Sequence, residues 1–82
     1  MNEERKIDFI INKYIYASEL FNIKYKNKYK IDVFVDFNFL NIYLRNLKEE
    51  KYYKVQILNN NINYLSSDVI LNCYEELIGK IM

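Results

Sequence analysis

Apolar residues recur at spacings of three and four along the first part of the chain, which is the period of an amphipathic helix. The residues on this stripe are Ile7, Ile10, Ile11, Tyr14, Ser18 and Phe21. Glu3 and Glu4 lie where the first turn would be, and carboxylates at that end interact favourably with the helix dipole. The pattern predicts a helix over residues 3–22 with one face in a core.

The period changes to two over residues 28–37, which is typical of a half-buried strand. The apolar or aromatic positions there are Tyr29, Ile31, Val33, Val35 and Phe37. Residues 53–58 have the same character and predict another strand. Residues 39–50 fit either a helical stripe or a strand that enters a turn at residues 48–51. The strand is favoured, because residues 53–58 would complete a hairpin with it.

A second helical stripe follows near the end of the chain, consisting of Ile70, Cys73, Tyr74, Leu77, Ile78 and Ile81. Ser66 or Ser67 is the expected cap of this helix, and Asp68 would lie in its first turn. The run of three asparagines at residues 59–61 predicts a turn, since asparagine tolerates left-handed backbone. Residues 62–65 are expected to form a short edge segment.

The predicted order is helix, three strands, helix, which describes a small α+β domain with both helices on one face of an antiparallel sheet. The alternative is α-β-α-β-α, if residues 39–50 are helical. A chain of 82 residues fits one domain over residues 1–82.

This order of elements resembles that of double-stranded-RNA-binding domains and of some small phage inhibitors of CRISPR nucleases. The RNA-binding domains carry lysines at the start of the last helix, where this chain has Ser66, Ser67 and Asp68. The resemblance therefore implies a topology and no function.

Composition narrows the classes of function. The chain has no histidine, one cysteine and one glycine, so the usual general base, zinc ligands and phosphate loop are missing. We therefore expect a protein that is not an enzyme and uses no cofactor, metal or small-molecule substrate. No apolar run exceeds four residues and the first residues are acidic, so we expect no membrane span and a cytoplasmic location.

Charge of one sign gathers only in residues 23–31, although the net charge is +1. This tract holds Lys24, Lys26, Lys28 and Lys30, interleaved with Tyr25 and Tyr29. If the tract is extended, the lysines form a row on one face and the tyrosines lie on the other. If residues 26–28 form a turn, the tyrosines pair across it and the lysines point into water. A solvated connection is expected first, then a protein interface, then nucleic-acid contact.

The first helix has a second apolar face formed by Phe9, Tyr16 and Leu20, which lie within about 40° of one another at about 100° per residue. Either the last helix covers this face or it meets a protein partner or a second copy. The sequence predicts a non-enzymatic protein-interaction module. One form would be a phage or mobile-element inhibitor, for example an anti-CRISPR-like protein that blocks a host protein sterically. The alternatives are a nucleic-acid-binding domain that uses the four lysines, and a homodimeric structural or antitoxin-type subunit.

Overall fold

The computed structural model describes residues 3–62 and 64–81 and has the predicted order of elements. Helix α1 (Glu3–Lys24) is followed by strands β1 (Tyr29–Val35), β2 (Phe39–Asn46) and β3 (Tyr52–Leu58), and then by helix α2 (Ser67–Leu77). Short 3-10 turns, η1 (Asn59–Asn61) and η2 (Ile78–Lys80), follow β3 and α2. The α+β prediction is confirmed, and the α-β-α-β-α alternative is wrong because β2 is a strand.

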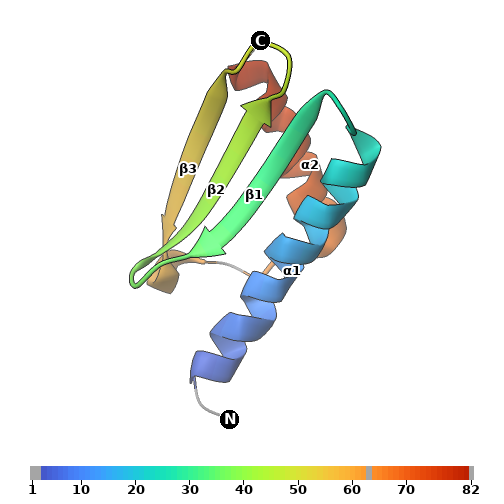
Figure 1. Cartoon of the computed structure of the whole chain (residues 1–82). Coiled ribbons are helices and arrows are strands. Elements are labelled where there is room, and N and C mark those ends of the chain that lie inside the picture. Colours follow the sequence, from blue (N-terminus) through green and yellow to red (C-terminus); the bar gives the residue numbers. More distant parts are fainter. Residues whose placement is uncertain (1–2, 63, 82) are drawn as a thin grey trace.

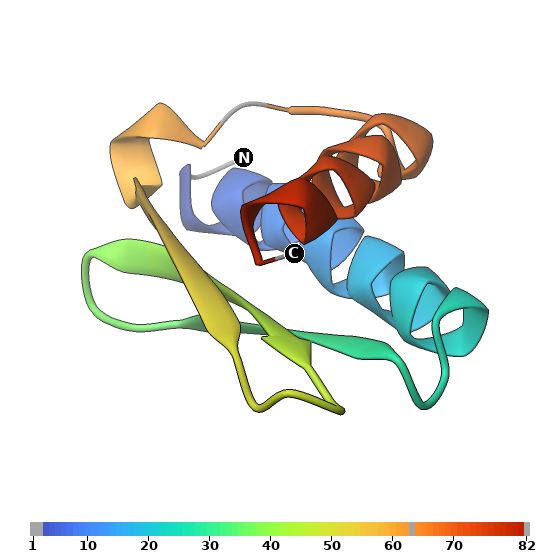
Figure 2. The same ribbon diagram turned by 90° about the horizontal axis from the view of Figure 1, so that it is seen from above.

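The three strands form one antiparallel sheet in the order β1-β2-β3, joined by two hairpins (Figure 1). Both helices lie on the same face of this sheet, so the domain has one helical layer and one sheet layer (Figure 2). The opposite face of the sheet is covered by no other element of the described residues.

Polar side chains close the hairpins in place of glycine and proline. The Asp36 carboxylate accepts hydrogen bonds from the backbone N–H groups of Asn38 and Phe39, at 3.0 and 2.9 Å. The Asn46 side chain accepts from the N–H groups of Lys48 and Glu49, at 3.0 and 3.1 Å. Such bonds replace a backbone turn, which is why asparagine and aspartate suffice here.

The core lies between the two layers. Its buried apolar side chains come from α1 (Ile10, Ile11, Tyr14, Ala17, Phe21), from the sheet (Ile31, Leu40, Ile42, Leu44) and from the C-terminal part (Ile70, Tyr74, Ile81). These are mostly the predicted stripes; the side chain of Ile7 lies outside the described residues. The Tyr74 hydroxyl donates to the Tyr14 carbonyl at 2.9 Å and ties α2 to α1.

Three details differ from expectation. Phe37 is 95% exposed, because β1 ends at Val35 and Phe37 lies in the turn that follows. Cys73, expected within the buried stripe, is exposed. Residues 62, 64 and 65 belong to no strand, so the predicted edge segment is wrong at these positions.

The N-terminal cap of α2 is Ser66, one of the two expected serines. Its hydroxyl oxygen accepts a hydrogen bond from the Val69 N–H at 3.3 Å.

Candidate functional site

The lysine tract is a turn between α1 and β1. Asn27 has a left-handed φ of 72°, and the N–H groups of Lys28 and Tyr29 both donate to the Tyr25 carbonyl, at 2.9 and 3.1 Å. The rings of Tyr25 and Tyr29 meet edge to face with centroids 5.9 Å apart. The turn interpretation is therefore correct, and the extended row of lysines does not form.

The four lysines consequently have separate surroundings. The Lys24 ammonium lies 2.8 Å from the Glu75 carboxylate of α2, to which the Tyr25 hydroxyl also donates. These two bonds hold the pKa of Glu75 below its usual value, and the bond from Lys24 contributes more than the bond from Tyr25. Lys30 lies on β1, with its ammonium 3.8 Å from the Asp32 carboxylate. Lys26 and Lys28 are exposed in the turn.

The second apolar face of α1 is partly covered. The Phe9 ring stacks on Tyr64, from the segment before α2, with centroids 5.8 Å apart. The Lys13 ammonium also lies 5.3 Å from the Phe9 ring centroid. Tyr16 is 53% exposed and Leu20 is half-buried. Phe9 is nevertheless 53% exposed, as is Tyr16, so the contact with Tyr64 leaves about half of the Phe9 surface open to solvent.

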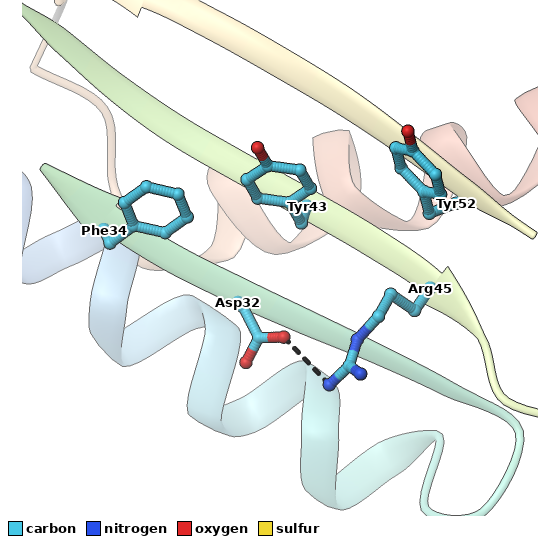
Figure 3. A pocket seen from close by; sticks show the side chains of 5 residues that line it. All are labelled: Asp32, Phe34, Tyr43, Arg45 and Tyr52. Carbon is cyan, nitrogen blue, oxygen red and sulfur yellow. Dashed lines mark ion pairs between the residues drawn. The ribbon is translucent and has the colours of Figure 1, made fainter. Parts of the chain in front are cut away.

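The uncovered face of the sheet carries a feature that the sequence analysis missed, a row of three aromatic rings with one from each strand. Phe34, Tyr43 and Tyr52 form this aromatic row, with centroids 5.4 and 6.3 Å apart (Figure 3). The strand register brings the three rings together. Tyr43 lies opposite Asp32, which is two residues before Phe34 on the same face of β1. Tyr52 lies opposite Arg45, which is two residues after Tyr43 on the same face of β2. Phe34 is 47% and Tyr52 is 66% exposed.

Charged groups surround the aromatic row. The Arg45 guanidinium pairs with the Asp32 carboxylate at 3.0 Å, and the two residues line a shallow hollow together with the three rings (Figure 3). The Lys54 ammonium lies 5.3 Å from the Tyr43 ring centroid. With Lys30 beside Asp32, and Asp36 bonded to Asn41 further along, this face holds three basic side chains and two acidic ones.

A polar ladder borders the row at its other end. Asn41, 1% exposed, donates to the Asp36 carboxylate at 3.1 Å and accepts from the Gln56 amide at 2.9 Å. The hydrogen bond from Asn41, followed by those from the Asn38 and Phe39 N–H groups, lowers the pKa of Asp36 below its usual value. Every strand is thus linked through side chains on this face, so the aromatic row stands on an ordered support.

The acidic side chains of the open face are engaged with neighbouring groups. None of the described His, Cys, Asp and Glu side chains form a group of three or more that could hold a metal ion. Asp32 is held by Arg45, and Asp36 by the turn and Asn41. This arrangement suits binding, because the exposed groups are aromatic rings and cations on a flat support.

Comparison with protein-family models, with curated proteins and with solved structures finds no match to this chain. None of the helices in the described part has both the length and the apolar character needed to cross a bilayer. The function is therefore to be inferred from the chemistry of the surfaces.

Proposed function

We propose that this chain is a protein-binding module that docks through the open face of its sheet. The observation that carries the proposal is the aromatic row of Phe34, Tyr43 and Tyr52, which no described element covers. Tyrosine, phenylalanine and arginine are enriched at the centres of protein interfaces. Rings held by neighbouring strands lose little conformational entropy when a partner orders them.

The surroundings of the row define the chemistry of the partner. The face carries an excess of one positive charge, since Lys30, Arg45 and Lys54 outnumber the carboxylates of Asp32 and Asp36. A partner that presents an apolar centre with an acidic rim would match both the rings and the charges. The partner is thus expected to be a protein surface that is acidic around an apolar contact.

The mechanism we propose is steric. The chain has no histidine, and the Asp32 and Asp36 carboxylates of the open face are engaged in an ion pair and a turn, which favours action by occupying a surface. Inhibition of a host protein, as by a phage or mobile-element inhibitor, is the specific form that this mechanism would take. Tyr16 and Leu20 lie on α1 in the other layer, so they would serve a separate contact.

The test compares wild-type and Tyr43→Ala chains as baits against a cell extract of the source or host. A protein that is acidic at the contact should bind the wild type with at least about tenfold higher affinity, because Tyr43 is the central ring of the row. The matched control is Tyr16→Ala, which removes an equally large ring from α1 and should leave the affinity unchanged. Circular dichroism checks that both variants are folded.

Two outcomes would overturn the proposal. If Tyr16→Ala loses the partner and Tyr43→Ala keeps it, the docking surface is the helical layer. If the wild type binds a single-stranded oligonucleotide with an affinity that falls steeply with salt, and Tyr43→Ala does not, the open face is a nucleic-acid site.

A further inference from the structure

Strand β3 has an outer edge that no other element pairs with. It is the last strand in the order β1-β2-β3, and Figure 1 shows it on the side of the sheet away from α1. Asn46 N–H donates to the Lys51 carbonyl at 2.7 Å, and Asn59 N–H donates to the Asn38 carbonyl at 2.9 Å.

In an antiparallel ladder, residues alternate between those whose backbone groups bond the neighbouring strand and those whose backbone groups face away from it. These two bonds therefore determine which backbone groups of β3 face β2. The backbone groups of the odd-numbered residues face β2. The N–H and C=O groups of the even-numbered residues, Tyr52, Lys54, Gln56 and Leu58, face outward. Among the described residues, no hydrogen bond reaches these outward groups.

The inner face of β3 is incompletely covered as well. Val55 and Ile57 are only half-buried, and Tyr53 is 37% exposed. Val55 and Ile57 line one side of an apolar groove of about 220 Å³ between β3 and α2. Its other walls include Leu65 and Leu77. A further strand beside β3 would cover this groove and satisfy the outward backbone groups in one step.

We infer that the strand beside β3 is β3 of a second copy, paired antiparallel about a twofold axis at Val55. In this register Tyr52 lies opposite the partner's Leu58, and Lys54 opposite the partner's Gln56. On the inner face, Tyr53 lies opposite the partner's Ile57, and Val55 opposite the partner's Val55. All seven residues of β3 are then paired, and each outward N–H meets an outward carbonyl.

The side chains of β3 fit this register. No two like charges lie opposite each other, because Lys54 faces the partner's Gln56 rather than its Lys54. The side chains on the inner face of the joint are all apolar or aromatic, and this face continues the groove. On the outer face, the partner's Leu58 places an apolar side chain beside Tyr52, at the end of the aromatic row. β3 has no proline and no inward-pointing charge to block its edge, and its one lysine, Lys54, lies on the outer face.

The other edge of the sheet, on β1, is occupied at one residue. The Asn22 side chain of α1 donates to the Ile31 carbonyl at 2.9 Å and accepts from the Ile31 N–H at 2.7 Å. At Ile31 a side chain therefore takes the place of a neighbouring strand, whereas no hydrogen bond among the described residues reaches the outward backbone groups of Val33 and Val35. Pairing through β3 alone yields a dimer with a continuous sheet, not a growing fibre.

Sedimentation equilibrium of the purified chain tests the inference without any partner protein. The expected mass is about twice 10.1 kDa at high concentration, falling to 10.1 kDa on dilution. A wild-type chain that stays at 10.1 kDa at the concentrations used for nuclear magnetic resonance overturns the inference.

Charge variants at the twofold axis test the register. Val55→Glu and Val55→Lys each place two like charges opposite each other, so each chain alone should be a monomer. An equimolar mixture should restore the dimer as a heterodimer, because the charges become complementary. A mixture of folded chains that stays monomeric contradicts the register, as does a Val55→Glu chain that remains a dimer.

A gentler variant applies if these chains fail to fold. Leu58 has a φ of −59°, which proline adopts without strain, and its N–H faces outward. Leu58→Pro should therefore weaken the dimer at least about tenfold relative to Leu58→Ala, since it removes a hydrogen bond at both ends of the joint. Equal dissociation constants for the two variants would show that the outer edge of β3 is not the interface.

Discussion

Strands β1 and β3 are both edge strands of seven residues, yet the two edges of the sheet are built differently. On β1, the side chain of Asn22 bonds both backbone groups of Ile31, and the Ile31 side chain is 1% exposed. On β3, the outward backbone groups meet no described residue, and Val55 is only half-buried. Protection of the β1 edge at Ile31 thus comes from where the helix lies rather than from strand composition.

The same difference holds for the side chains around each edge. Phe21 of α1 is 0% exposed and contacts Tyr25 and Tyr74 with ring centroids 4.6 and 6.3 Å away. Tyr53 of β3 is 37% exposed, and its neighbours Val55 and Ile57 line the open groove. The first side is a completed core, and the second is a core that lacks its outer cover.

The largest expected effect compares truncation on the two sides. Phe21→Ala should lower the free energy of unfolding by about 4 kcal/mol, because it leaves a large cavity in the packed side. Tyr53→Ala should lower it by about 1 kcal/mol, since much of that ring is already in water. Urea unfolding of dilute protein measures both. Equal losses would contradict the contrast between the two sides.

A smaller effect is expected from opening the protected edge. Asn22→Ala leaves the buried N–H and C=O of Ile31 without partners, which should cost about 2 kcal/mol in urea unfolding. Asn12→Ala is the control, because Asn12 is exposed on the same helix. A loss for Asn22→Ala no larger than for Asn12→Ala would show that Asn22 does not seal β1.

Amide exchange compares the edges residue by residue. In dilute protein the Ile31 amide should exchange slowly, because its N–H donates to Asn22, whereas those of Lys54 and Gln56 should exchange quickly. Asn22→Ala should speed exchange at Ile31 and leave Lys54 and Gln56 unchanged. Slow exchange at Lys54 that does not depend on concentration would mean that β3 is covered within one chain.

The smallest effect concerns the acid end of the pH range. The pKa of Glu75 lies below its usual value because Lys24 and Tyr25 bond to its carboxylate. This contribution to stability is present above the pKa of Glu75 in the unfolded chain, and is lost as the pH falls through the lower pKa of the folded chain. Glu75→Gln should therefore be less stable than the wild type at pH 7, with the difference shrinking below about pH 4.

The control for this pH dependence is Glu76→Gln, which changes an exposed neighbour on the same helix. Thermal unfolding at several pH values measures both variants. A Glu75→Gln difference that stays constant across pH would contradict the role of the ion pair between α1 and α2.

The aromatic row was harder to predict than the fold. The alternation in residues 28–37 and the stripe in residues 67–77 are local, so periodicity located them. Phe34, Tyr43 and Tyr52 are scattered along the chain, and only the strand register places them side by side. The proposed role of Phe9, Tyr16, Leu20 and the four lysines remains a prediction, although the lysines are now dispersed by the turn at Asn27.

Local pattern was enough for the order of elements, the capped second helix and most of the core, since each depends on residues a few positions apart. The tertiary structure decided the rest. It placed Asn22 on the edge of β1, left β3 uncovered and exposed Cys73, because these outcomes depend on how α1 and α2 cross the sheet. Helix placement is a property of the whole packed core, so no short stretch of sequence encodes it.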